Sequence, residues 1–187
     1  MPAWSNNVPQ AVWDAAASVL FAFALALAIT RFLAQLVRVK GSSMENTLKN
    51  GDLLLTVRPG KYRRGEPVIC RYPRRVTKKV ELNAAFTLTW HTLFVKRLVA
   101  LPGDVVEIRE GQLFVNDSAV PDPPLMAGPP RDYAPRRLGP KEYFVIGDNR
   151  RSSHDSRAAD VGPIREGMLQ GHVKAVLWPP KRIQIVK

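Results

Sequence analysis

A long uncharged apolar run near the N-terminus constrains this chain more than any other feature of its sequence. No residue from Ala15 to Thr30 carries a charge, and as a helix this stretch would span about 24 Å at about 1.5 Å per residue. Continued past Arg31 to Val37, the helix would span about 34 Å, against a hydrocarbon core of about 30 Å. The long side chain of Arg31 can reach the lipid headgroups. The sequence therefore predicts a single transmembrane helix at residues 15–36, after a short tail of residues 1–14.

Two other interpretations of this run stay open. Ala24-Leu25-Ala26 and Ala26-Leu27-Ala28 have the small-x-small form of a signal peptide cleavage site. A cleaved signal peptide normally begins with a positive region, however, and residues 1–14 contain no Lys or Arg. A buried core helix is the second alternative, and so uniformly apolar a helix would need cover on every side.

The charges that flank the run predict its orientation. Arg31, Arg38 and Lys40 follow it, whereas Asp14 precedes it. Cationic residues beside a transmembrane helix tend to stay in the cytoplasm, so this pattern favours a cytoplasmic C-terminal domain.

Beyond Gly41 the sequence changes to short apolar runs separated by turn residues, which is typical of strands. Pro121 to Pro140 is rich in Pro, Gly and Arg, and is predicted to be a long surface loop. Strands and helices do not alternate, so residues 37–187 are expected to form one mainly β domain. The predicted strands are Asp52–Val57, Pro67–Tyr72, Leu93–Leu101, Asp104–Arg109, Gln112–Asn116, Tyr143–Ile146, His172–Trp178 and Arg182–Val186.

Composition and charge narrow the class of protein without selecting a partner. The chain has 187 residues, of which 45% are hydrophobic, so it can bury a core. The net charge is +12, and much of the basic excess lies between Arg58 and Lys79. That stretch is either a solvated hairpin face or a surface that attracts anionic lipid, acidic polymers or nucleic acid. The single cysteine, Cys70, excludes an intrachain disulfide, and no Cys/His set has zinc spacing.

Three polar stretches carry residues suited to hydrolytic chemistry. The first is Gly41-Ser42-Ser43-Met44, a turn that can present a serine. The second places Lys96-Arg97 in an apolar run that continues to Pro102-Gly103-Asp104. The third is Gly147-Asp148-Asn149-Arg150, followed by Ser153-His154-Asp155-Ser156-Arg157. Each alone is consistent with ordinary turns and surface charges, and their order along the chain gives them weight.

With the apolar run ahead of them, these stretches resemble type I signal peptidases, the membrane-anchored serine endopeptidases that remove signal peptides from exported proteins. That family has a Ser-Met pair soon after its membrane segment, then Lys-Arg with Gly-x-Pro-Gly-Asp, then Gly-Asp-Asn-Arg with Ser-x-Asp-Ser-Arg. The match extends from the apolar run to about Pro163. The resemblance implies a signal-peptidase-like β catalytic domain behind one N-terminal transmembrane helix.

The resemblance implies that Ser43 is the nucleophile and Lys96 its general base. A serine hydroxyl attacks a carbonyl only when a base takes its proton. A lysine can act as that base only when it is neutral, so its pKa must lie well below about 10. Burial lowers a lysine pKa because it penalises the ammonium form. Strand alternation places Phe94 and Leu98 on the face of Lys96, where they can supply an apolar wall.

The resemblance assigns supporting roles to three residues of the last stretch. Ser153 matches a serine that hydrogen-bonds the lysine and orients its amine. Asp155 and Arg157 match a pair that braces the surrounding loop. The oxyanion of the intermediate needs preorganised donors, and the backbone N–H of Ser43 is the expected first donor.

The chain departs from the family pattern at three positions. Gly41 stands where some members place a serine hydroxyl, so the second oxyanion donor is unassigned, with Ser42 or a water as candidates. Asn46 replaces the proline that is usual after Ser-Met-x, which predicts a less rigid loop. Ala100 replaces the common first Gly of Gly-x-Pro-Gly-Asp, which predicts different backbone packing there.

The family's activity implies the substrate, the partners and the location. Its substrates carry small residues at the first and third positions before the cut, the Ala-x-Ala preference, and an extended peptide can bind by strand addition. Residues near Ser43 and the strand around Leu93 to Val99 are the expected walls. Preprotein signal peptides and membrane lipid are the implied partners, with no nucleic acid, metal or cofactor. Residues 1–14 would be cytoplasmic and the β domain extracytoplasmic on the cell membrane, against the charge pattern, although large domains translocate despite flanking charge.

Two rival functions make different predictions. A basic β domain that binds acidic polymers or lipid would bind in a salt-dependent way and would be indifferent to Ser43→Ala. A related self-cleaving Ser/Lys regulator is nearer in chemistry, but the apolar run and the lack of an evident partner domain argue against it.

Overall fold

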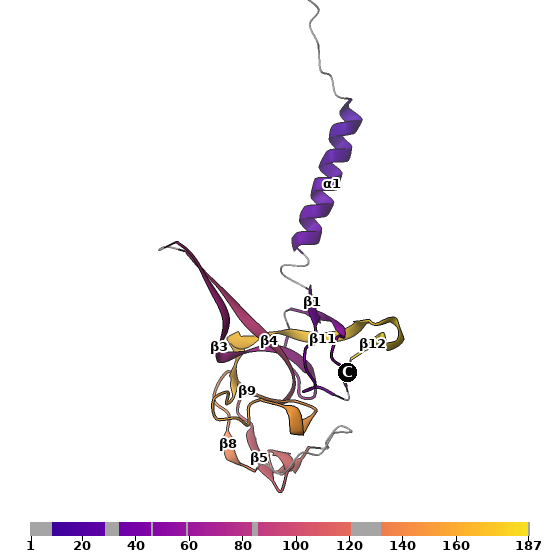
Figure 1. Ribbon diagram of the computed structural model, residues 1–187. Helices are drawn as coiled ribbons and strands as arrows, with labels where there is room; N and C mark the ends of the chain where they lie inside the picture. The colour runs from indigo at the N-terminus through magenta and orange to yellow at the C-terminus, as the bar shows by residue number, and fades with distance from the viewer. Residues whose placement is uncertain are drawn as a thin grey trace, which may run out of the picture. The chain divides into compact units, whose positions relative to one another are not determined.

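The computed structural model describes residues 9–28, 34–45, 47–58, 60–83, 86–120 and 132–186, without the side chains of residue 27 and residues 73–92. The chain forms two compact units, Met1–Gln35 and Leu36–Lys187. The first contains helix α1 (Gln10–Ala28), and the second contains the sheets (Figure 1).

Helix α1 begins inside the region predicted to be a tail. Pro9 precedes its first residue, Gln10, and the carbonyl of Pro9 accepts the N–H of Val12 at 2.8 Å. A single acidic side chain does not end a helix, so Asp14 lies within α1. No helix in the described part of the chain is long and apolar enough to cross a membrane. The large apolar side chains that α1 exposes are Val12, Trp13, Val19, Leu20, Phe21, Phe23 and Leu25.

The predicted helix of residues 15–36 is wrong at its C-terminal end. Residues 29–33 lie outside the described residues, and strand β1 (Ala34–Arg38) takes up residues 34–36. β1 lies beside β2 (Leu53–Val57), and just beyond it the N–H of Val39 donates to the carbonyl of Asp52 at 2.8 Å. The prediction failed because an apolar run alone does not separate a helix from a half-buried strand.

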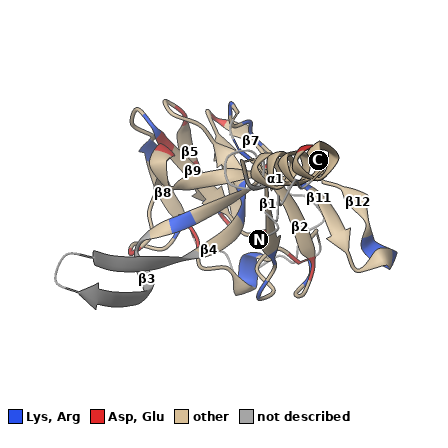
Figure 2. Cartoon of the chain, turned by 90° about the horizontal axis from the view of Figure 1, so that it is seen from above, with Lys and Arg blue, Asp and Glu red and all other residues tan. Residues whose placement is uncertain are grey.

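The β unit contains two sheets, and the mainly β prediction is confirmed. The larger sheet has the order β1-β2-β11-β3-β4-β9-β10, with β12 paired to β11, and the smaller has the order β7-β6-β5-β8. Figure 2 shows β1, β2 and β11 side by side, with β5 and β8 farther across the unit. The remaining strands are β3 (Pro67–Asn83), β4 (Phe86–Ala100), β5 (Val105–Arg109), β6 (Gln112–Val115), β7 (Ser118–Ala119), β8 (Tyr133–Arg137), β9 (Glu142–Ile146), β10 (Ile164–Arg165), β11 (Leu169–Trp178) and β12 (Gln184–Ile185).

Every predicted strand from Asp52 to Trp178 is present, but two strands run much farther than their apolar cores. β3 and β4 pair antiparallel from Pro67 opposite Arg97 to Asn83 opposite Phe86. The pairing therefore continues through part of the basic stretch, where the sequence has no simple apolar alternation. The backbone of the part of that stretch that lies in β3 therefore belongs to a hairpin, which is one of the two interpretations of its charge.

Two other predictions about the β unit need correction. Residues 121–131 of the predicted loop lie outside the described residues, but β8 falls within the rest of it and pairs with β5, with Val106 opposite Arg136. Of Arg182–Val186, only the two residues of β12 are strand. Arg182 belongs instead to the 3₁₀ turn Pro180–Arg182, whose proline lacks the N–H that a strand ladder needs.

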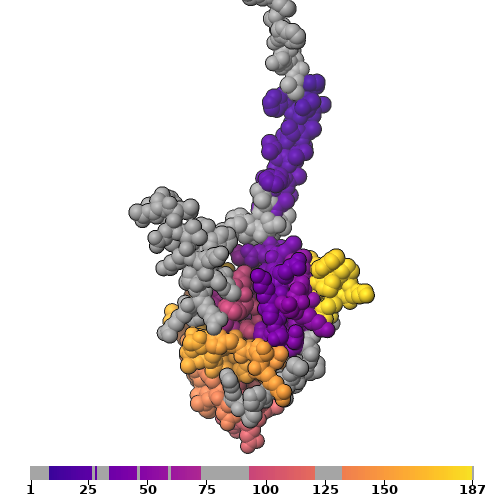
Figure 3. Space-filling model, viewed as in Figure 1, coloured from indigo at the N-terminus to yellow at the C-terminus, as the bar shows by residue number. Residues whose placement is uncertain are grey.

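The core that matters most for the site lies under the turn after β1. Its members are buried apolar side chains from β2, β3, β11 and that turn. Figure 3 shows the C-terminal residues, in yellow, beside the purple segment that contains this turn and β2. The cluster consists of Val39, Met44, Leu48, Leu54, Ile69, Val173 and Val176, with Val37, Val95 and Val186 packed against it.

Candidate active site

Ser43 lies in the turn that follows β1, and apolar anchors hold that turn. Met44 and Leu48 are 2% and 0% exposed, whereas Ser43 is half-buried. Gly41 has φ +93°, a conformation in which any side chain is strained. Its N–H donates to Asn50 Oδ1 at 3.0 Å. The positive φ therefore favours glycine at position 41.

Lys96 is buried in β4, with 2% of its surface exposed. Phe94 and Leu98, which are predicted to share its face of the strand, belong to one apolar cluster. The ring of Tyr72 stacks on Phe94 with centroids 4.0 Å apart. Burial is the largest influence on this amine and lowers the pKa of Lys96, while the nearby carboxylate of Asp155 partly opposes it.

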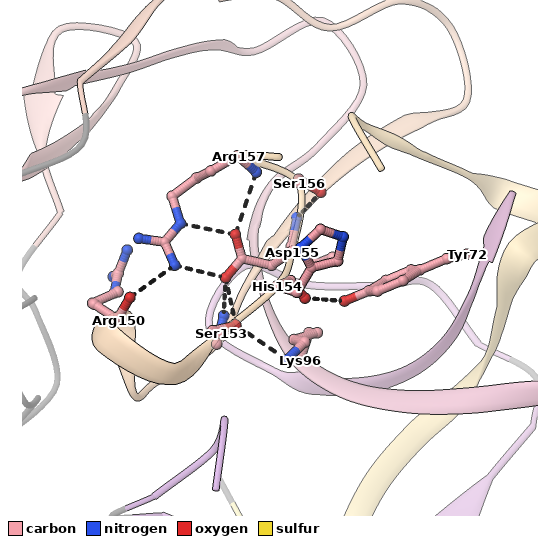
Figure 4. Close-up of polar contacts among 10 residues, drawn as sticks. Tyr72, Lys96, Arg150, Ser153, His154, Asp155, Ser156 and Arg157 are labelled. Carbon is pink, nitrogen blue, oxygen red and sulfur yellow. Dashed lines mark hydrogen bonds and ion pairs between the residues drawn. The ribbon is translucent and has the colours of Figure 1, made fainter. Parts of the chain in front are cut away.

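A continuous chain of hydrogen bonds leads from Lys96 to Arg157 (Figure 4). Lys96 Nζ donates to Ser153 Oγ at 3.1 Å, and Ser153 Oγ donates to Asp155 Oδ2 at 2.6 Å. Arg157 Nε and Nη2 donate to the two carboxylate oxygens of Asp155 at 2.8 and 2.9 Å. Because the hydroxyl of Ser153 donates its hydrogen bond to Asp155, its oxygen accepts a hydrogen bond from the amine of Lys96. The lone pair of a neutral Lys96 is then left for another group.

Asp155 is a buried charge that its neighbours stabilise. Burial is the largest influence and by itself would raise the pKa of this carboxyl. Hydrogen bonds and charge from Arg157, the N–H of Gly147 and the hydroxyl of Ser153 outweigh burial and lower the pKa below its usual value. Asp155 is therefore ionised near neutral pH and keeps its bidentate pair with Arg157.

Gly147 is the point where the Ser43 turn and the Lys96 network meet. A Cβ at this position would lie 2.1 Å from Ser153 Oγ and 2.5 Å from the carbonyl oxygen of Ser43. That carbonyl also accepts the N–H of Asn149 at 3.0 Å. Among the described residues, the Ser43 hydroxyl and the Lys96 amine are not hydrogen-bonded to each other. Ser43 is thus held next to the network through backbone contacts.

A second polar clamp joins the same segments and was not predicted. Arg97 donates to both carboxylate oxygens of Asp148 at 2.7 Å, and Thr47 Oγ1 donates to Asp148 Oδ2 at 2.6 Å. The exposed fractions of the Arg97 and Asp148 side chains are 13% and 2%. The sequence offers one sign of this clamp, since an arginine follows Lys96 and an aspartate follows Gly147, but spacing cannot show that these two charges meet.

The two candidates for the second oxyanion donor were Ser42 and a water. Ser42 Oγ lies 3.1 Å from Ser152 Oγ, so the structure directs this hydroxyl to the turn that precedes Ser153. Within the described part of the chain, no three His, Cys, Asp or Glu side chains are grouped as metal ligands. Cys70 is buried and its pKa is raised to about 12, chiefly by burial, so it is not a competing nucleophile.

A small pocket of about 150 Å³ lies between β1 and β4, and Ser43 lines it. β4 pairs with β9 only from Arg97 onward, and β1 is the last strand of its sheet among the described strands. The pocket thus lies beside two strand edges. A larger open hollow of about 960 Å³ near β8, β9 and β10 contains none of the predicted site residues. The small pocket is lined by Val37, Arg38, Val39, Lys40, Ser43, Met44, Leu93, Phe94 and Val95.

Several known proteins are similar to this chain. A probable signal peptidase I-2 from Synechocystis sp. is 30% identical, over 97% of this chain and 80% of that protein. The signal peptidase I S of Bacillus subtilis is 32% identical, over 94% of this chain and 95% of that protein. A crystal structure of a signal peptidase I from Enterococcus faecalis V583 has 22% identity and a TM-score of 0.46, and covers 62% of this chain and 98% of that one.

The family model described as "Signal peptidase, peptidase S26" matches residues 12–178, which is most of the chain. The relatives above match over nearly the whole chain at about the same level of identity. The chain therefore belongs to the signal peptidase family S26 and is a serine hydrolase of the signal peptidase I type.

Proposed function

We propose that this chain removes signal peptides from preproteins with Ser43 as the nucleophile and Lys96 as the general base. The observation that carries the proposal is the buried Lys96 amine, whose pKa is lowered and whose position Ser153 fixes. A lysine in this environment is neutral over a pH range in which an exposed lysine is charged.

In the proposed reaction, Lys96 carries one proton in each of two steps: from Ser43 to the leaving amine, and then from water back to Ser43. Ser43 Oγ attacks the scissile carbonyl while its proton passes to Lys96 Nζ, and the backbone N–H of Ser43 stabilises the oxyanion. The resulting ammonium protonates the departing amine, which is the new N-terminus of the mature protein. Lys96 then removes a proton from a water molecule, which attacks the acyl-enzyme. The ammonium returns that proton to Ser43 Oγ as the ester bond breaks, and the signal peptide leaves as a carboxylic acid that ionises in water.

The pocket between β1 and β4 supports a preference for small-x-small sequences. A peptide added between the two strand edges would present alternate side chains to the same face. Its first and third residues before the cut would then point into a pocket of about 150 Å³, which favours alanine over larger side chains. Val37, Val39 and Val95 would supply the apolar wall.

Membrane attachment through α1, with the β unit on the extracytoplasmic side, is the second part of the proposal. Its support is the exposed apolar surface of α1, where Phe21 and Leu20 are 71% and 67% exposed and would otherwise face water. Alkaline extraction of cell membranes would leave the full chain in the pellet. Protease added to intact spheroplasts would digest the β unit, whereas full protection would contradict the proposed side of the membrane.

The decisive experiment is cleavage of a preprotein that carries Ala-x-Ala, in non-ionic detergent, by the wild type, Ser43→Ala and Lys96→Ala. We expect the wild type to cut after the second alanine and each variant to lose at least about 10³-fold in kcat, because the two residues act as a unit. Circular dichroism would confirm that the variants are folded. Full activity in either variant would refute the dyad, and an inactive, folded wild type would refute the function.

A further inference from the structure

Residues 37–40, at the end of β1 and just beyond it, present two different faces beside the pocket. Val37 and Val39 pack into the apolar cluster under the Ser43 turn, whereas Arg38 and Lys40 are exposed. All four residues line the same small pocket. This segment therefore has apolar side chains on one face and cations on the other. Both lie next to the pocket in which the proposed function places the substrate.

The charged side chains that line this pocket are all cationic. Its lining includes the cations of Arg38 and Lys40 but no Asp or Glu. In the described part of the chain, neither cation takes part in a salt bridge, and both side chains are exposed. The other lining residues are uncharged, and none of them offsets this field.

Strand geometry determines which substrate residue would meet these cations. Residues directly opposite on neighbouring strands point to the same face, and successive residues alternate between faces. If the first and third residues before the cut point inward with Val37 and Val39, the second residue points outward with Arg38 and Lys40. The middle position of small-x-small is therefore the one exposed to the cations.

We propose that Arg38 and Lys40 favour an acidic side chain, and disfavour a basic one, at the middle position of the small-x-small sequence. The proposal rests on the proposed function and adds a charge preference at a position that the pocket itself leaves free. Because both cations are exposed, water and salt weaken their field. We therefore expect about a threefold to tenfold difference in kcat/KM between glutamate and lysine at this position, declining as salt is added.

The test uses one preprotein with Ala-Glu-Ala, Ala-Gln-Ala or Ala-Lys-Ala before the cut, in non-ionic detergent at low salt. The full-length wild type should rank them in that order by kcat/KM. In the double variant Arg38→Gln/Lys40→Gln, the Glu-to-Lys ratio should fall toward one. The matched control is Arg165→Gln/Lys174→Gln, which removes two exposed cations outside the pocket and should keep the wild-type ratio.

The outcomes separate this proposal from the function on which it rests. Efficient cleavage with a wild-type Glu-to-Lys ratio near one would overturn the charge preference and leave the peptidase activity intact. A ratio that persists in the double variant, or that the control also abolishes, would overturn the role of Arg38 and Lys40. So would a preference seen only with anionic vesicles, because the cations would then be binding lipid. Failure to cut any of the three substrates would refute the proposed function itself.

Discussion

Ser43 and Lys96 approach each other from two regions that are stabilised by different forces. The Ser43 turn is anchored by buried apolar side chains such as Met44 and by backbone hydrogen bonds. Lys96 is instead held by a network of charged groups that ends at the ion pair of Asp155 and Arg157. Packing thus fixes where the proposed nucleophile lies, whereas electrostatics sets how readily the proposed base gives up its proton. Substitutions in the two regions should therefore fail in different ways.

Gly147→Ala should have the largest effect, because it acts on both regions at once. The new Cβ would overlap Ser153 Oγ and the carbonyl of Ser43, at 2.1 and 2.5 Å, so one of them must move. We expect kcat/KM to fall by about 10²-fold or more, since a displacement of about 1 Å is enough for such a loss. The control is Gly167→Ala, where a Cβ would meet nothing within 4 Å. Equal activity in the two variants would contradict the close approach at Gly147.

Asp155→Asn should disrupt only the charged network around Lys96. It leaves the largely buried guanidinium of Arg157 without its carboxylate, so we expect the free energy of unfolding to fall by about 3 to 5 kcal/mol in urea titrations. The same change at Asp160, whose pair with His154 is exposed, should cost no more than about 1 kcal/mol. Similar losses at both positions would argue against a special role for the buried pair.

The same variant also tests the pH dependence. In the wild type, kcat/KM should rise with pH as Lys96 loses its proton, with a midpoint below the ordinary lysine pKa of about 10.4. The carboxylate of Asp155 raises the pKa of Lys96, so its removal should move the midpoint of the residual activity to lower pH. A midpoint that moves upward would show that another group controls the profile.

Met44→Ala should disrupt only the apolar packing under the Ser43 turn. Of these variants, it should have the smallest effect on catalysis. The cavity under the Ser43 turn should lower the free energy of unfolding by about 2 to 5 kcal/mol and reduce kcat. The midpoint of the pH profile should stay where it is in the wild type, because no charge near Lys96 changes. The exposed Ile185→Ala serves as the control. A shifted midpoint in Met44→Ala would show that the two regions are not independent.

Local sequence patterns predicted the features that depend on neighbouring residues, namely the strands and the faces of those strands. The alternating apolar runs identified the strands from Asp52 to Trp178, and alternation placed Phe94 and Leu98 beside Lys96. The end of the helix was missed because residues 34–36 are apolar enough for a helix or a strand, and pairing with β2 decides between them. Propensity is a weak guide where a neighbour in space supplies the stronger interaction.

The parts of the site that could not be predicted all join segments far apart in the chain. Ser43, Lys96 and Ser153 were identified from a family resemblance, but spacing gave no sign that Gly147 lies between two of them. The clamp of Arg97, Asp148 and Thr47 likewise depends on how β4 and the two turns pack. The sequence predicted no strand before Asp52, so the pocket walls at Val37 and Arg38 were not identified.

The helical state of α1 bears on whether one copy of the chain could cut another. Ala24-Leu25-Ala26 has the small-x-small form that a peptidase of this type would cut, and it lies within α1. An enzyme that takes its substrates as added strands needs free backbone N–H and C=O groups, and a helix uses those groups internally. If the chain takes its substrates as added strands, as proposed, folding as a helix would keep this segment from binding in the pocket of another copy. Substitutions that unwind α1 near Ala26 would turn a protected segment into a substrate.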